Sequence, residues 1–263
     1  MPAALRIGIF RHAESLSNAG GRTRSVTHIP LTEKGHQQAQ ILAQRHVAAP
    51  SRIIHSPFLR ARQTAMPLCD RFERAASRPW PIQEFTYLEP KSCINTSWIE
   101  RKPRIDAYWQ RLDPLYVDGE GAESFAQLLR RAQDFLLRLT RLRLSGEALK
   151  ADIGARTAPC FDLTIVSHGQ FMQACLCLLE HPGADAQALM RHFRDRQEQT
   201  PFANCEGLFL QRPSAGGREH VAQKWKPVLR NNMRQSKELE HGFDSVRTQR
   251  APDLTLVARI PAP

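Results

Sequence analysis

The chain has 263 residues, 41% of them apolar, and a formal net charge of +11 at pH 7. This length allows one large or two small domains with a hydrophobic core, and no apolar run approaches the ~18 to 20 residues that a membrane span needs. The six cysteines include no C-x-x-C pair, which excludes the usual zinc and redox patterns and predicts reduced, mostly buried thiols. We expect a cytoplasmic protein without a cleaved signal.

The positive charge is spread along the chain. The basic residues are not interleaved with aromatic residues in a nucleic-acid-binding signature. A net charge of this sign is compatible with nucleic acid, an anionic surface or a small anionic substrate, and does not choose between them. We expect a solvated basic surface, with no nucleic-acid or membrane partner.

The first 88 residues alternate short apolar runs with amphipathic segments. Pro67 lies inside one of the amphipathic segments and can kink the helix there. The pattern predicts, in chain order, a strand over residues 5–10, a helix over 33–47 with Thr32 as N-cap, a strand over 51–57, a helix over 58–72 and a strand over 80–88.

The middle of the chain is less regular. Residues 89–122 mix Pro, Gly, Trp and basic residues, and predict an excursion over the surface with one helical piece near residues 104–112. Residues 122–144 follow with apolar side chains every three or four positions, which is typical of an amphipathic helix. A near-continuous apolar strand is predicted over residues 161–169, and helices over 170–180 and 185–197.

The last part of the chain predicts a pair of strands over residues 204–212 and 219–225, joined by a Pro-Ser-Ala-Gly-Gly turn. The residues after Arg230 are polar and predict a tail that is laid on the surface or disordered. Strands that alternate with helices indicate one α/β domain with a largely parallel central sheet. In such sheets ligands bind beyond the carboxyl ends of the strands.

Polar residues gather at three of these strand or helix ends. Arg11 and His12 end the first strand, Arg60 lies at the start of the second helix, and His168 and Gly169 end the strand over residues 161–169. If the strands are parallel neighbours, these side chains meet in one crevice. Two arginines and two histidines without several carboxylates form a site for a dianion, and phosphate fits the paired donors of a guanidinium. Helix N-termini would add backbone N–H donors.

Five segments carry a resemblance to a known family. RHAESLSN, PLTEKGHQQA, SPFLRARQTA, ESFAQLLRRA and VSHGQFM resemble, in order and spacing, the signatures of the histidine phosphatase superfamily, the phosphoglycerate mutase-like enzymes. The resemblance covers about residues 5–210. It implies a three-layer α/β/α sandwich, with a catalytic domain over residues 1–229, a surface insertion at about 89–122 and a tail over 230–263.

The resemblance also implies roles for single residues. His12 would be the nucleophile that forms a phosphohistidine, because an imidazole with an unperturbed pKa of ~6.5 keeps a free lone pair at neutral pH. The cationic side chains would make a metal or cofactor unnecessary. The residues that would hold the phosphate group are Arg11, Asn18, Arg60, His168 and Gly169.

The family also supplies a carboxylic acid that protonates the leaving group, and two glutamates are candidates. Glu84 keeps the family's apolar-x-Glu pattern, whereas Glu89 directly follows a leucine. We favour Glu84 and keep Glu89 as the alternative. Asn204 resembles a family position near the pocket, but an asparagine that caps a strand turn explains it equally well.

Two departures from the family concern the loops that shape the substrate pocket. His28 stands where the family often has an acidic residue, and SCINTSWIERKP (92–103) replaces a glycine-tryptophan segment. The expected activity is hydrolysis of a small-molecule phosphate monoester. A phosphoglycerate mutase is the first alternative, although its Glu-Arg-His-Tyr-Gly sequence is missing at both glutamates. The second is a catalytically silent binding protein on the same fold, and a homodimer is left open.

Overall fold

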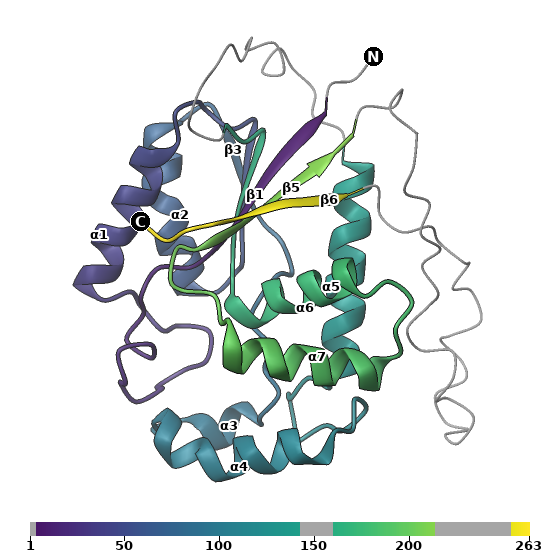
Figure 1. Ribbon diagram of the computed structural model, residues 1–263. Coiled ribbons are helices and arrows are strands. Elements are labelled where there is room, and N and C mark those ends of the chain that lie inside the picture. Colours follow the sequence, from purple (N-terminus) through teal and green to yellow (C-terminus); the bar gives the residue numbers. More distant parts are fainter. Residues whose placement is uncertain (1–3, 143–159, 214–253) are drawn as a thin grey trace.

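The strands assemble into one six-stranded sheet, and the computed structural model describes residues 4–142, 160–213 and 254–263 (Figure 1). The order in the sheet is β3-β2-β4-β1-β5-β6. The first four strands in this order are parallel, while β5 is antiparallel to β1 and β6 to β5, so the predicted mostly parallel sheet is confirmed. The strands are β1 (Leu5–Arg11), β2 (Arg52–His55), β3 (Ala76–Pro79), β4 (Leu163–Ser167), β5 (Gly207–Arg212) and β6 (Thr255–Ile260).

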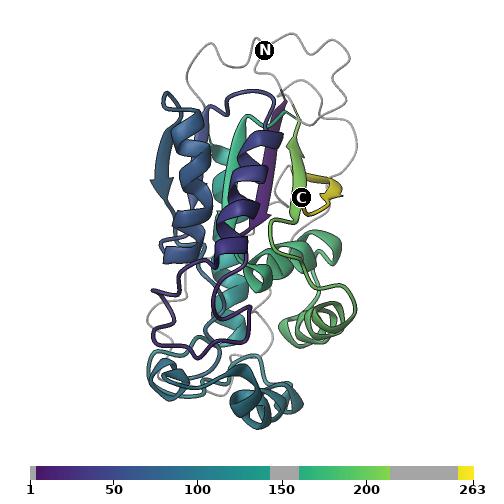
Figure 2. The ribbon, with the colours of Figure 1, turned by 90° about the vertical axis from the view of Figure 1, so that its left-hand side faces the viewer.

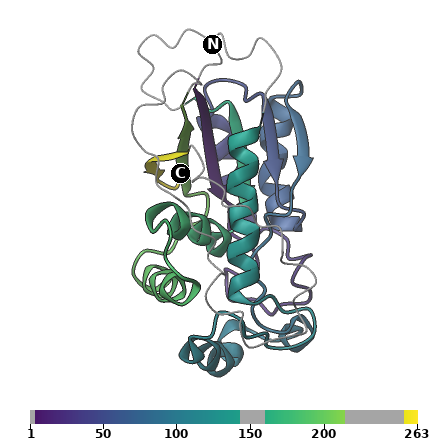
Figure 3. The ribbon, with the colours of Figure 1, turned by 90° about the vertical axis from the view of Figure 1, so that its right-hand side faces the viewer.

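Helices cover both faces of the sheet. Figure 2 shows α1 (Glu33–Arg45) and α2 (Leu59–Arg71) on one face, and Figure 3 shows α5 (Phe125–Arg141) on the opposite face. α6 (Gly169–Glu180) packs against α5, and α7 (Ala186–Gln199) packs against α6. The chain is therefore an α/β/α sandwich, as predicted.

Neighbouring side chains on each strand divide between the two faces, as the pleat requires. In β2, Ile53 packs in a small cluster with residues of α1 and α2, whereas Ile54 belongs to the main core on the α5 side. In β4, Val166 and Ile165 divide in the same way. α5 follows a Ser124 capping box and buries its apolar stripe in the main core, which confirms the helix predicted over 122–144 as far as the described residues extend.

The segment after β3 crosses the end of the sheet. α3 (Pro90–Cys93) and α4 (Trp98–Arg111) lie beyond the carboxyl ends of the parallel strands (Figure 1). The single helical piece predicted near residues 104–112 is therefore too short. α4 begins six residues earlier because Ser97 and Glu100 form a capping box, and the helix then continues through Pro103.

The strand predicted over residues 80–88 does not form. These residues run as an irregular loop, and β3 lies just before them on the exposed edge of the sheet. Trp80, Ile82, Phe85 and Leu88 are buried in the main core. The apolar pattern that is typical of a strand thus arises here from a loop that packs its side chains under α5 and α4.

The predicted C-terminal arrangement is also wrong in part. β5 pairs with β1 on one side and with β6 on the other, whereas residues 219–225 lie outside the described residues. β6 lies within the segment predicted to be a tail, so that prediction fails for residues 255–260. β1 covers only one edge of β5. β6 pairs with the other edge and hydrogen-bonds its backbone N–H and C=O groups.

All six cysteines are free, and five of them are buried, which agrees with the predicted reduced thiols. None of the helices in the described ranges is long and apolar enough to cross a membrane.

Candidate active site

The carboxyl ends of β1, β4 and β2 lie side by side and carry the predicted polar residues. Arg11 pairs in register with Ser167, and the His12 N–H donates to the Ser167 carbonyl over 2.9 Å. β2 flanks β4 on the other side and leads into α2, which carries Arg60. His168 directly follows β4. The sheet order therefore brings together Arg11, His12, Arg60 and His168, which come from three segments that are far apart in the sequence.

The loop after β1 is fixed against the two helices on that face. The Ala13 N–H donates to Thr64 Oγ1 of α2 over 3.0 Å. Glu14 accepts two bonds from Thr32, the N-cap of α1: its carbonyl from the Thr32 N–H (3.0 Å) and its Oε1 from the hydroxyl (2.9 Å). A side chain at Gly35 would place its Cβ 2.0 Å from the Glu14 carbonyl oxygen, so only glycine allows this approach.

His12 is buried, with 2% of its surface exposed, and its tautomer follows from its two partners. Arg60 Nε lies 3.1 Å from His12 Nε2, and His12 Nδ1 lies 2.7 Å from the Ala13 carbonyl oxygen. A guanidinium only donates, so Nε2 carries the lone pair and Nδ1–H donates to Ala13. Burial, followed by the charges of Arg60 and Arg11, holds the pKa of His12 well below 6.5. The imidazole is therefore neutral at neutral pH.

The two arginines are positive charges with little compensation. Burial lowers the pKa of Arg60 to about 10, and burial also lowers the pKa of Arg11, while Glu84 is the carboxylate that counteracts both shifts most. Arg11 Nη1 donates to the Phe202 carbonyl, but its Nε is buried without a hydrogen-bond partner in the described ranges. Gly169 lies beside this guanidinium, and a Cβ there would be in ordinary van der Waals contact with Arg11 Nε at 3.4 Å. Unpartnered buried donors of this kind favour an anionic ligand.

His168 lies behind His12 rather than on the cavity wall. It is completely buried, its ring centroid lies 5.0 Å from that of His12, and Nε2 lies 2.8 Å from Ser56 Oγ. Its Nδ1 is buried and has no hydrogen-bond partner in the part of the chain that the structure describes. Burial, followed by the charge of Arg60, holds the pKa of His168 well below 6.5.

A cavity of about 340 Å³ opens at this end of the sheet. Asn18 lies on its wall, and Asn18 Oδ1 accepts from the Ser15 N–H and from Asn204 Nδ2 (both 3.2 Å). Asn204 Nδ2 also donates to the His12 carbonyl over 2.9 Å. Asn204 therefore joins the loop before β5 to the loop after β1. The wall contains six of the seven predicted site residues: Arg11, His12, Asn18, Arg60, Glu84 and Gly169.

The two candidate acids lie in different places. Glu84 lies on the cavity wall, where its Oε1 accepts from the Gln170 N–H at the start of α6 (3.2 Å) and from the Phe85 N–H (3.1 Å). Glu89 is the N-cap residue of α3, packs against Gly119, and is not part of the wall. The geometry therefore favours Glu84 over Glu89 as the acid.

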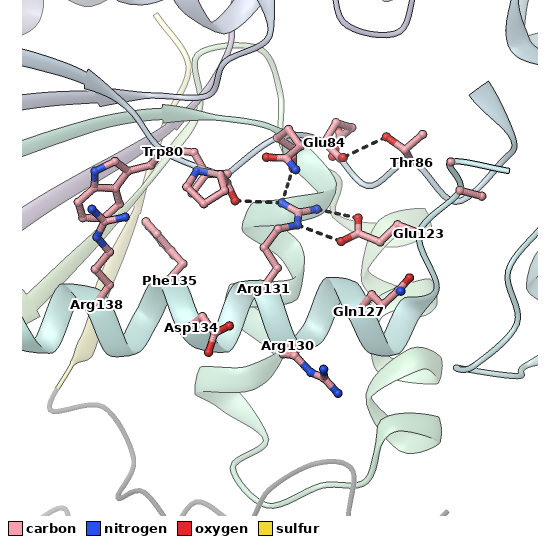
Figure 4. Close-up of a pocket in the computed structure, with 15 residues that line it drawn as sticks. Trp80, Glu84, Thr86, Glu123, Gln127, Arg130, Arg131, Asp134, Phe135 and Arg138 are labelled. Atoms are coloured by element: carbon pink, nitrogen blue, oxygen red, sulfur yellow. Dashed lines mark hydrogen bonds and ion pairs between the residues drawn. The ribbon is translucent and has the colours of Figure 1, made fainter. Parts of the chain in front are cut away.

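A pair of charged residues that the sequence did not single out holds the loop that carries Glu84. Figure 4 shows Arg131 extending from α5 toward this loop with Glu123 beside it. Arg131 donates to both Glu123 carboxylate oxygens (2.9 and 2.7 Å) and to the Gln83 carbonyl (2.8 Å), while the Glu123 N–H donates to the Thr86 carbonyl (2.8 Å). We call this pair the Arg131–Glu123 clamp. It fixes the backbone on both sides of Glu84.

A second cavity, of about 640 Å³, lies over the same clamp and also contacts Glu84 (Figure 4). Its wall includes Trp80, with the Arg138 guanidinium 3.8 Å from the ring centroid, but none of Arg11, His12 or Arg60. The smaller cavity is therefore the one with the chemistry of phosphate binding.

Comparisons with known proteins show the family of the chain. The family model described as histidine phosphatase superfamily (branch 1) matches residues 7–196. Over 133 residues, 50% of this chain and 63% of the relative, the sequence is 27% identical to phosphoserine phosphatase 1 of Hydrogenobacter thermophilus. Over 143 residues, 51% of this chain and 64% of the relative, it is 31% identical to the protein named "Probable phosphoglycerate mutase GpmB" of Erwinia tasmaniensis.

The chain thus spans just under two thirds of the length of the curated relatives that it matches. The fold also resembles that of a mycobacterial glucosyl-3-phosphoglycerate phosphatase, with a TM-score of 0.56 and 20% sequence identity over 79% of this chain and 90% of that one. The relatives' names include phosphatases and a mutase, so they do not choose between hydrolysis and transfer.

Proposed function

Because this chain belongs to the histidine phosphatase superfamily, we propose that it hydrolyses phosphate monoesters through a phosphohistidine on His12. The observation that carries the proposal is the state of His12. Its Nε2 keeps a lone pair at neutral pH, accepts from Arg60, and lies on the wall of a cavity that also contains Arg11 and Glu84. A buried, neutral nucleophile next to two uncompensated cations suits attack on a dianionic phosphate.

In the first step, His12 Nε2 attacks phosphorus. The N–P bond forms while the P–O bond to the alcohol breaks, and the electron pair of that bond leaves with the alkoxide. Arg11 and Arg60 hold the nonbridging oxygens and stabilise the charge that spreads over them in the transition state. Arg60 gives up its bond to Nε2 when phosphate enters and donates to a phosphate oxygen instead.

Glu84 protonates the leaving alkoxide. Its Oε1 is taken by the backbone N–H groups of Phe85 and Gln170, so the proton that it transfers sits on Oε2. Asn18 and the Gly169 N–H at the start of α6 add donors for the phosphate oxygens. A phosphate oxygen that reaches the unpartnered His168 Nδ1 would satisfy that buried atom.

In the second step, water attacks phosphorus from the side that the alcohol left. The Glu84 carboxylate takes a proton from the water, the new P–O bond forms, and the electron pair of the N–P bond returns to His12 Nε2. Inorganic phosphate leaves and the site returns to its starting state. The cationic side chains supply the charge stabilisation throughout, so the proposal includes no metal and no cofactor.

A phosphoglycerate mutase activity is the second candidate, because the 31% identical relative carries that name. A mutase would return the phosphoryl group to a second position on a substrate rather than to water. A silent binding protein would keep the phosphate site without turnover. The expected cytoplasmic location, the absence of nucleic-acid and membrane partners and a homodimer all stay predictions.

A panel of phosphate monoesters, assayed with EDTA present, tests the proposal. We expect release of inorganic phosphate that is insensitive to EDTA and absent in His12→Ala, with His36→Ala as a control because His36 is an exposed histidine on α1. Transfer to phosphoglycerate without phosphate release would indicate the mutase. Binding of phosphate without turnover would indicate the silent protein, and full turnover by His12→Ala would refute the mechanism.

A further inference from the structure

The cavity wall changes character away from the phosphate-binding end. Beyond Arg11, His12 and Arg60, half of the residues of the wall are apolar, and they come from the loop after β1, the start of α2, the loop that carries Glu84, the α3–α4 segment and the loop before β5. The apolar members are Val26, Ile29, Phe58, Phe85, Tyr87, Leu88, Cys93, Trp98, Ile105 and Phe202.

One further cation, Arg101, belongs to this wall, and one nitrogen of its guanidinium, Nη1, is engaged by the protein. Arg101 Nη1 donates to the Thr96 carbonyl (2.8 Å) and hydroxyl (3.0 Å), and to Thr23 Oγ1 (3.3 Å). These bonds hold the start of α4 against the loop after β1, where Thr23 also pairs with Thr96 as an isolated bridge.

The aromatic residues of the apolar wall pack against one another and against α4. Phe85 and Tyr87 contact each other (ring centroids 5.3 Å apart), and both contact Trp109 of α4. Trp109 in turn stacks on Phe193 of α7 at 5.5 Å. These rings belong to the main core or pack against it, so the wall keeps its shape without a ligand.

Trp98 is the least buried of these apolar residues. It is the first residue of α4 and remains 52% exposed while it lines the cavity. A large exposed aromatic side chain at the opening of an apolar cavity is available to cover an apolar ligand. The α3–α4 segment therefore supplies contact surface to whatever alcohol is attached to the phosphate.

We infer that the alcohol of the substrate carries a bulky apolar group, alkyl or aromatic. This inference rests on the proposed phosphatase function and narrows its substrate class. The phosphate end of the cavity supplies charge and hydrogen bonds, and the other end supplies burial of apolar surface. Specificity then comes from the segment in which this chain departs from its family.

A series of straight-chain alkyl phosphates from ethyl to octyl tests the inference, because the leaving-group pKa changes little along the series. We expect kcat/KM to rise by about threefold for each added methylene until the wall is covered. Phosphoserine and 3-phosphoglycerate should react more slowly than hexyl phosphate. Trp98→Ala should flatten the dependence on chain length.

Ile99→Ala is the matched control, because Ile99 is the next residue of α4, is 66% exposed and is not part of the wall. This variant should keep the wild-type chain-length dependence. A flat series, or faster turnover of the two carboxylate-bearing esters, overturns the inference and leaves the phosphatase function intact. Calorimetry with the matching alkylphosphonates separates the two claims: affinity that rises with chain length without turnover of any ester supports the apolar wall and refutes the phosphatase.

Discussion

Arg60 Nε donates a hydrogen bond to His12 Nε2 over 3.1 Å, and this one contact assigns the lone pair of the buried histidine. Because the donor is a guanidinium, the acceptor must be an unprotonated imidazole nitrogen. In the proposed mechanism, a bound phosphate replaces His12 as the hydrogen-bond partner of Arg60. The free site is thus ready for a nucleophilic attack that needs no prior proton removal.

Replacement of Arg60 should abolish most of the activity. Arg60→Lys keeps one charge but loses the paired donors, so we expect kcat to fall by about 10² to 10³-fold with phosphate esters. Arg62→Lys, on the exposed side of the same helix, is the control and should behave like the wild type. Wild-type kcat in Arg60→Lys would show that Arg60 does not hold the transferred group.

The acid can be identified from leaving-group dependence. Glu84→Gln should lose kcat/KM, which reports the phosphorylation step, by about 10² to 10⁴-fold with alkyl esters and much less with p-nitrophenyl phosphate, whose leaving group needs no proton. Glu89→Gln should show no such difference, because Glu89 caps α3 away from the cavity. If the two variants exchange these behaviours, the assignment of Glu84 is wrong.

The Arg131–Glu123 clamp should matter through the position of Glu84. Glu123→Gln removes one charge of the clamp, and we expect kcat/KM for alkyl esters to fall by about 10 to 100-fold while that for p-nitrophenyl phosphate is affected much less. Arg138→Met, two turns of α5 after Arg131, is the control. Equal losses with both kinds of ester would indicate a purely structural role for the clamp.

The buried histidines predict how stability depends on pH. The pKa values of His12 and His168 are lowered in the folded state, so below about pH 6.5 the unfolded chain binds protons that the folded chain does not. The free energy of unfolding should therefore fall as the pH drops below about 6.5, by about 1.4 kcal/mol per pH unit for each group. Urea denaturation at pH 7.5, 6.0 and 5.0 measures this slope.

His168→Gln isolates the contribution of one histidine. The variant should be less stable than the wild type at pH 7.5, where a buried hydrogen bond is altered, but its stability should fall less steeply between pH 6.0 and 5.0. An unchanged slope would mean that His168 takes up a proton in the folded state as readily as in the unfolded chain.

The sequence was sufficient to predict the centre of the site. Arg11, His12 and His168 directly end or follow apolar strands, and Arg60 lies at the start of a helix, so the parallel sheet alone brings them together. The residues that support them were predicted only in part, because their roles depend on contacts between distant segments. The sequence left Asn204, which bonds the His12 carbonyl, open between a pocket position and a turn cap, and it did not single out Arg131 and Glu123, which hold the Glu84 loop.

The wrong predictions have physical causes as well. The loop over residues 80–88 has the apolar alternation of a strand because it packs Trp80 and Phe85 into the core without pairing its backbone. β6 (TLVARI) was not predicted because the segment after Arg230 that contains it is largely polar, although four of its own six residues are apolar, and nothing in its local pattern indicates that it pairs with β5. Local pattern predicts burial, whereas backbone pairing depends on which strand edge is free.

The most direct test of the account is to trap the phosphorylated protein. After reaction with a ³²P-labelled phosphate ester and a rapid alkaline quench, we predict label that is stable to base, labile to acid and carried by the peptide that contains His12. Glu84→Gln should accumulate more label with p-nitrophenyl phosphate, because the attacking water loses its base, and His12→Ala should carry none. Rapid turnover without any trapped label in Glu84→Gln, or undiminished turnover in His12→Ala, would contradict the proposed mechanism.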